Sequence, residues 1–135
     1  MKDINRLLNR PEIIKQKILQ CKYEIDGLRD QLMPGSMEYG KIKVQFTPSD
    51  KLPEIEARID ELERKIKHLK KEKAKAINNI KKVAVKLQEE QKTVIIGLYV
   101  ANRTVQEIAG EMNYSIRSIY NIKKDAIESM KKNRY

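Results

Sequence analysis

The sequence has few of the residues that build a broad globular core or a cross-linked one. It contains no Trp, one Phe, one Cys, four Pro and five Gly among 135 residues. A single cysteine excludes an intrachain disulfide and fits a reducing compartment. No apolar run approaches the ~20 residues that a membrane-spanning helix needs, and no signal-peptide pattern follows Met1. We therefore expect a cytoplasmic protein that consists mainly of solvated helices.

Charge, in contrast, is abundant and unevenly distributed. Charged residues make up 36% of the chain, and the formal net charge is +10. The basic excess is +2 in residues 1–50, +5 in residues 51–92 and +3 in residues 93–135. An excess toward the C-terminal two thirds suggests a polyanionic partner. A need for solubility explains the charge equally well, so charge alone assigns no function.

Residues 1–33 are predicted to form an N-terminal helix with one apolar seam. Because proline cannot donate a backbone hydrogen bond, Pro11 suits the first position of a helix. We therefore expect a short helical turn over residues 3–9 and a main helix from Pro11, which Pro34-Gly35-Ser36 ends. Spacings of three and four define the seam, which consists of Ile4, Leu7, Pro11, Ile14, Ile18, Cys21, Ile25, Leu28 and Leu32.

Residues 34–50 are predicted to form a mobile loop. Residues 41–46 alternate polar and apolar side chains, which would suit one short strand, but no partner strand is evident. Ser49 or Asp50 is then placed to cap the next helix, with Pro53 in its first turn.

Residues 51–88 are predicted to form a long, basic, coiled-coil-like helix. Two seamed helices joined by a loop either fold back as an antiparallel hairpin or pair with another subunit, and the sequence leaves both open. The second seam has the same alternating spacing and consists of Ile55, Ile59, Leu62, Ile66, Leu69, Lys73, Ala76, Ile80, Val83 and Leu87.

The middle of this second helix is strongly basic. Nine Lys or Arg and one acid, Glu72, lie between Arg64 and Lys82. The segment is either an arm that tracks DNA phosphates or a solvated helix face. The candidate phosphate contacts are Lys70, Lys71, Lys75, Lys81 and Lys82.

Residues 89–135 change to short helices separated by turn signals. Residues 101–103 interrupt an apolar stripe, and Asn102 tolerates the left-handed conformation that ends helices. Thr104 and Glu107 have the spacing of a capping box. Residues 113–114 then form the next turn, and Ser115 is a good N-cap for a final helix over residues 116–132.

The final helix has an apolar stripe and an opposite face without acids in its first two turns. Such a face suits insertion beside DNA phosphates. Arg117 is suited to guanine and Asn121 to adenine, while other polar side chains of this face are suited to phosphates. Plain helical packing would produce the same caps and turns. The candidate DNA-binding residues are Thr104, Ser115, Arg117, Ser118, Tyr120, Asn121, Lys123 and Lys124.

A family resemblance makes the DNA-binding interpretation specific. The pattern Thr104-x-x-Glu107-Ile108-Ala109, then Tyr114-Ser115-x-x-Ser118-Ile119-Tyr120-x-Ile122-x-x-x-Ala126-Ile127, resembles region 4 of the sigma-70 family. It is most similar to the C-terminal domains of the RinA/ArpU group of phage transcriptional regulators. That group also has N-terminal helices, a Pro/Gly-containing loop and a long charged helix before its helix-turn-helix.

The resemblance implies that six of the candidate residues contact DNA: Ser115, Arg117, Ser118, Tyr120, Asn121 and Lys124. Two positions depart from the family pattern. Asn102 stands where a glycine is usual, and Val105 stands where many relatives have an aromatic residue. The regions with which a sigma factor binds core polymerase and melts promoters are missing, so we do not expect a complete sigma factor.

No motif of the sequence indicates catalysis or a cofactor. There is no glycine-rich phosphate loop, nucleophile motif or metal-ligand cluster. His68 is the only histidine, without an acid or cysteine at metal-ligand spacing. We therefore expect a protein that is not an enzyme and that holds no metal.

The sequence thus predicts an all-α fold, with a long helical hairpin or coiled coil followed by a C-terminal helix-turn-helix domain. The expected function is sequence-specific transcriptional regulation, and the resemblance implies an activator of phage or mobile-element late genes. The expected partners are double-stranded DNA, host RNA polymerase and a second copy of the chain. Two alternatives stay open: a DNA-packaging adaptor similar to a small terminase subunit, which would assemble as a ring, and a structural coiled-coil protein that binds nucleic acid non-specifically.

Overall fold

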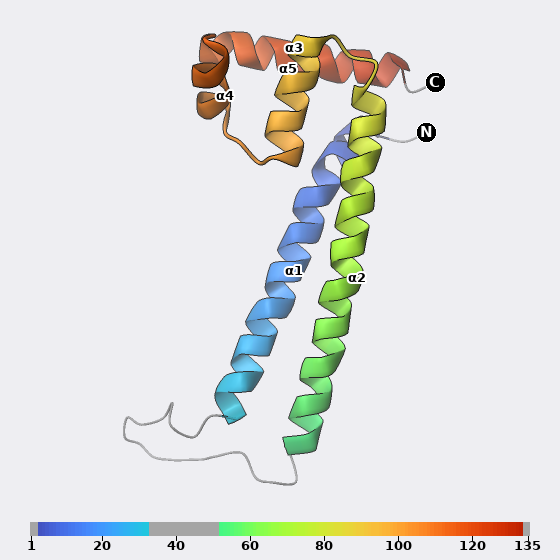
Figure 1. The fold of residues 1–135 in the computed structure, drawn as a ribbon, viewed down its shortest axis with the longest axis vertical. Coiled ribbons are helices and arrows are strands. Elements are labelled where there is room, and N and C mark those ends of the chain that lie inside the picture. The colour runs from blue at the N-terminus through green and yellow to red at the C-terminus, as the bar shows by residue number, and fades with distance from the viewer. Residues whose placement is uncertain (1–2, 33–51, 134–135) are drawn as a thin grey trace. The chain divides into compact units, whose positions relative to one another are not determined.

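The computed structural model describes residues 3–32 and 52–133, and within them all regular structure is helical (Figure 1). This confirms the all-α prediction. The predicted loop over residues 34–50, its short strand and the caps at Ser49 or Asp50 lie outside the described residues. The elements are α1 (Ile4–Leu32), α2 (Leu52–Ala84), α3 (Glu89–Ile95), the π-helical turn η2 (Ile96–Val100), α4 (Val105–Met112) and α5 (Ile116–Asn133).

The described residues divide into two compact units. The hairpin unit consists of residues 14–32 of α1 and 52–72 of α2. The C-terminal unit consists of residues 3–13 and 73–133, and so includes the start of α1, the end of α2 and all of the shorter helices.

In the hairpin unit, α1 and α2 run antiparallel (Figure 1). Their apolar seams close against each other. Two ion pairs bridge the helices, Arg29 with Glu63 at 3.0 Å and Arg58 with Glu24 at 3.3 Å. All four side chains are half exposed, so these pairs contribute little to stability compared with the seam. The seams therefore meet within one chain. The buried residues are Cys21, Ile25, Ile55, Ile59 and Leu62.

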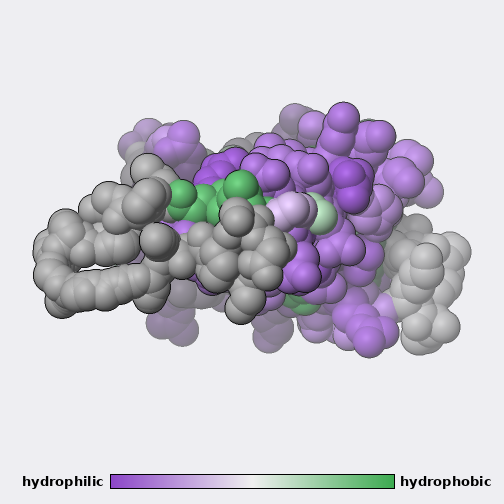
Figure 2. All heavy atoms as spheres, turned by 90° about the horizontal axis from the view of Figure 1, so that it is seen from below, coloured by the Kyte–Doolittle hydropathy of each residue, from purple (hydrophilic) through white to green (hydrophobic). Residues whose placement is uncertain are grey.

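The face of the described residues that Figure 2 shows is mostly hydrophilic. In the space-filling view, purple hydrophilic atoms cover most of the visible described surface, and hydrophobic atoms appear in a small band (Figure 2). This agrees with helices that bury one stripe and solvate the rest. No described helix has the length and apolar character that crossing a membrane requires.

The predicted break at Pro11 is wrong. Instead of a turn over residues 3–9 and a separate helix, α1 runs without interruption from Ile4 through Pro11. Pro11 has no backbone N–H, so α1 lacks one intrahelical hydrogen bond there. The Pro11 side chain is buried in the seam, and this burial offsets the loss. Burial of Ile4 and Leu8, each 2% exposed, holds the first turns of α1 in place.

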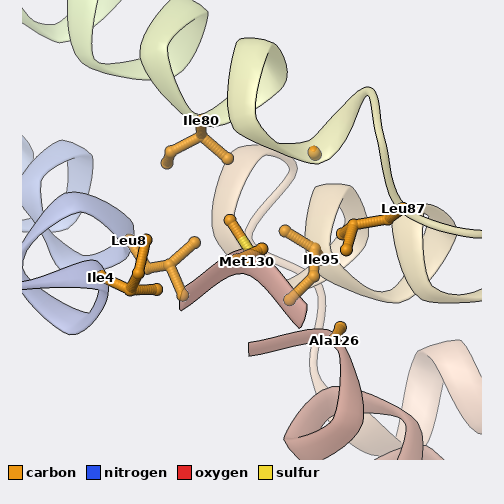
Figure 3. Packing of buried hydrophobic residues seen from close by; sticks show 8 residues of the cluster. Ile4, Leu8, Ile80, Leu87, Ile95, Ala126 and Met130 are labelled. Atoms are coloured by element: carbon orange, nitrogen blue, oxygen red, sulfur yellow. The ribbon is translucent and has the colours of Figure 1, made fainter. Parts of the chain in front are cut away.

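One core cluster of the C-terminal unit joins four helices. The side chain of Met130 on α5 lies among those of Ile80 on α2 and Ile95 on α3, with Leu8 of α1 nearby (Figure 3). The cluster therefore fixes the C-terminal half of α5. Its buried members are Ile4, Leu8, Ile80, Ala84, Leu87, Ile95, Ala126 and Met130.

The predicted helix over residues 51–88 is too long. Helix α2 ends at Ala84, and the backbone N–H of Leu87 donates to the Ala84 carbonyl at 2.9 Å in a tight turn. Gln88 is then extended, with φ −63° and ψ 155°, and precedes α3. The turn places Leu87 in the same buried cluster as Ile95. No Gly or Pro lies at the end of α2. The burial of Leu87 therefore determines where the helix stops.

Helix α4 begins with the predicted capping box. Thr104 Oγ1 accepts a hydrogen bond from the Glu107 N–H at 3.1 Å, and Glu107 Oε1 accepts one from the Thr104 N–H at 2.9 Å. The backbone hydrogen bond from Thr104 lowers the pKa of the Glu107 carboxyl, and Arg103 at 3.7 Å adds to this. The box satisfies two of the orphan donors at the start of the helix.

We expect Thr104→Ala to lower the free energy of unfolding by about 1 kcal/mol, because the Glu107 N–H loses its acceptor. The matched control is Thr93→Ala. The Thr93 hydroxyl donates at 2.8 Å to the Glu89 carbonyl within α3, and its loss should change stability by less than about 0.5 kcal/mol. Urea unfolding followed by circular dichroism measures both. Equal effects of the two substitutions would contradict a stabilising cap at Thr104.

Candidate DNA-binding surface

Helices α3, α4 and α5 pack around a second core cluster. Ile119 of α5 and Val94 of α3 are both 0% exposed, and they contact Ile108 and Ala109 of α4. Ala109 is small, as a close helix crossing requires. Because Ile119 is buried against both neighbouring helices, the rotation of α5 about its axis is fixed.

The turn between α4 and α5 falls at the predicted residues 113–114. Asn113 adopts the left-handed conformation with φ 62°, and the Tyr114 N–H donates to the Ala109 carbonyl at 2.9 Å. The Tyr114 hydroxyl donates to the Glu90 carboxylate, which raises the pKa of Tyr114. This hydrogen bond joins the turn to α3.

Ser115 caps α5 as predicted. Its Oγ accepts a hydrogen bond from the Ser118 N–H at 3.1 Å, and the two hydroxyl oxygens lie 3.0 Å apart in a second hydrogen bond. The first turn of α5 contains no acidic residue. The start of the helix therefore combines a satisfied cap with the positive end of the helix dipole.

The π-helical turn η2 was not predicted. It continues α3 directly, and the Ala101 N–H donates to the Ile96 carbonyl at 3.0 Å, five residues back. A Cβ at Gly97 would lie 2.9 Å from Ile108 Cδ1, so a glycine here lets η2 approach α4 closely. The predicted interruption at residues 101–103 is confirmed, with Asn102 at φ 58°.

The exposed side of α5 carries polar residues suited to bases and to phosphates. Arg117, Asn121 and Lys124 follow i, i+4, i+7 spacing and share one face. All three are exposed, and the side chain of none of them forms a hydrogen bond or ion pair with another described residue. We call these three residues the reading face. Tyr120 lies beside it and is 53% exposed.

Other candidate residues have roles within the fold. Thr104 and Ser115 use their hydroxyls in caps, and Ser118 is half-buried beside Ser115. Lys123 is half-buried, with its Nζ 5.9 Å from the centre of the Tyr99 ring, so it lies at the edge of the core. Contacts of these side chains with DNA stay a prediction.

A shallow groove continues from Tyr120 toward the end of α5. It has a volume of about 340 Å³ and an apolar floor that includes Ile127. Lys131 lies there although it is absent from the predicted site. The i, i+4, i+11 spacing of Tyr120, Lys124 and Lys131 would have identified it. The lining residues are Tyr120, Lys123, Lys124, Ile127, Glu128 and Lys131.

The predicted phosphate-contacting lysines form two exposed rows on α2. Helical spacing places Lys71, Lys75 and Lys82 in one row. Lys70 and Lys81 form the other row. Lys75, Lys81 and Lys82 belong to the same compact unit as α3, α4 and α5, whereas Lys70 and Lys71 belong to the hairpin unit.

No described group of histidine, cysteine or acidic residues is arranged to hold a metal ion. Cys21 is a free thiol buried in the hairpin seam.

Comparison with known proteins identifies the C-terminal helices. The family model of sigma-70, region 4 matches residues 84–132, which are less than half of the chain. The comparison with curated proteins gives no match, and neither does the comparison with solved structures. The matched segment starts at the last residue of α2 and includes α3, η2, α4 and nearly all of α5. Residues 84–132 are therefore a helix-turn-helix similar to sigma-70 region 4, a DNA-binding module.

Proposed function

We propose that the protein is a non-enzymatic, sequence-specific transcriptional regulator that binds DNA with Arg117, Asn121 and Lys124. One observation carries the proposal. The three side chains share an exposed face of α5 and have no partner among the described residues, while the opposite side of α5 is buried. In a helix-turn-helix, the second helix enters the major groove with its N-terminal residues at the base edges.

Each residue of the reading face contacts a different group of the DNA. The Arg117 guanidinium donates two hydrogen bonds to O6 and N7 of guanine, and the Asn121 amide pairs with N6 and N7 of adenine. Lys124 and Tyr120 contact phosphates, which set the position of α5 in the groove without reading sequence. The first acid of α5 is Asp125, more than two turns from the start of the helix, so no carboxylate opposes entry.

The biological setting follows from the resemblance to the RinA/ArpU group. We propose an activator of phage or mobile-element late genes that works in the cytoplasm of a bacterial host and contacts host RNA polymerase. The basic excess of the chain supports a polyanionic partner. A homodimer would bind two half-sites about one helical turn apart, or a multiple of that distance.

We expect Arg117→Ala and Asn121→Ala each to weaken binding by ~1–3 kcal/mol and to relax the preference at one base pair. Binding is measured with a duplex that the full chain selects from a randomised pool, and with single base-pair variants of that duplex. Arg6→Ala is the matched control, because it removes one exposed arginine of the same compact unit outside α5. Unchanged affinity and preference in both α5 variants would show that another surface reads the DNA.

We expect the triple variant with Lys70, Lys71 and Lys75 changed to Gln to bind DNA with a weaker salt dependence. The slope of log K against log salt is negative, and each lost phosphate contact should reduce its magnitude by about 0.9. The control changes Lys15, Lys17 and Lys22 to Gln, which removes the same charge from exposed positions of α1. If both triple variants have the same slope, the α2 lysines form a solvated face and make no phosphate contact.

A further inference from the structure

The start of α5 exposes apolar side chains that the fold does not use. Within the C-terminal unit, five large apolar or tyrosine side chains are exposed, and three of them fall between residues 114 and 120. The exposure of Tyr114 has an explanation within the fold, because its hydroxyl donates a hydrogen bond to Glu90. Ile116 at 44% and Tyr120 at 53% exposure lie one turn apart on the same side of α5. About half of each of these two residues is open to solvent.

The position of Ile116 places it beside the reading face. It is the first residue of α5, immediately before Arg117, and the buried stripe of the helix begins only at Ile119. A single exposed isoleucine is ordinary on a protein surface. An isoleucine next to Arg117 is in reach of base edges, because the first residues of a recognition helix are those that contact them.

We infer that Ile116 recognises thymine by packing against its 5-methyl group. This rests on the proposed function, which it extends with a third base contact. The major-groove edges of the four bases carry hydrogen-bond donors and acceptors, and the thymine methyl is the apolar group among them. Ile116 has no polar group to offer a base but supplies an apolar surface of matching size. Tyr120, one turn further on, flanks this contact and excludes water from it.

Charge favours DNA over a second copy of the chain as the occupant of this surface. Arg117 and Lys124 lie on the neighbouring face, and the first two turns of α5 contain no acid. Two copies that met through Ile116 and Tyr120 would bring these cations together without a counter-charge. A duplex supplies phosphates on both sides of the groove, so it neutralises the same cations.

The test replaces single thymines of the selected duplex by deoxyuridine, which removes only the methyl group. We expect the wild-type chain to lose about fourfold in affinity at one thymine position, the value that ~0.8 kcal/mol for one buried methyl gives. Ile116→Ala should bind the thymine duplex more weakly and should not distinguish it from the uracil duplex. Ile116→Val keeps part of the apolar surface and should retain part of the discrimination.

Val85→Ala is the matched control, because Val85 is an apolar residue with 63% exposure outside α5. The Val85→Ala variant should keep the full wild-type difference in affinity between the thymine duplex and the uracil duplex. The inference is overturned if no uracil position weakens wild-type binding, or if Ile116→Ala keeps the difference. It is also overturned if Ile116→Ala changes the oligomeric state, because the surface would then be a contact between copies. Absence of any sequence preference in the wild-type chain would instead refute the proposed function.

Discussion

The burial of one side of α5 against α3 and α4 determines what its other side presents to solvent. Ile119, Ala126 and Met130 are all 0% exposed and lie along this side. The side chains of Ile119 and Met130 each contribute about 1.5–3 kcal/mol relative to exposure, and the smaller side chain of Ala126 contributes less. Because successive residues of a helix turn by about 100°, this burial directs Arg117, Asn121 and Lys124 away from the core. The reading face therefore depends on the core beneath it.

The remaining elements hold that arrangement at its ends. The left-handed Asn113 and the Tyr114–Glu90 hydrogen bond set the angle at which the chain enters α5. Gly97 lets the π-helical turn approach Ile108, which brings α4 against α3. Met130 and its neighbours from α1 and α2 fix the far end of α5. The N-terminal helices thus contribute directly to the core that supports the helix-turn-helix.

Local patterns in the sequence predicted much of this structure. The capping box at Thr104, the Ser115 cap and the exposed face of α5 follow from residues within seven positions of one another, so spacing alone reveals them. The end of α2 did not follow, because Leu87 fits the helical period and only its burial beside Ile95 favours the turn. The structural roles of Pro11 and Gly97 could not be predicted from the local sequence either. The preference of proline for the first position of a helix suggested a helix start at Pro11, and no local rule suggested a role for Gly97. In the structure, contacts with residues distant in sequence determine the conformation at both positions.

The central claim is that the exposed face of α5 contacts DNA. Titration of the ¹⁵N-labelled full chain with the duplex it selects, followed by NMR, tests this residue by residue. The account predicts that the largest amide shift changes fall in residues 115–124, with smaller ones in the lysine rows of α2. A duplex of scrambled sequence should produce weaker changes at Arg117 and Asn121. Changes confined to α1 and α2, with the α5 amides unmoved, would contradict the account.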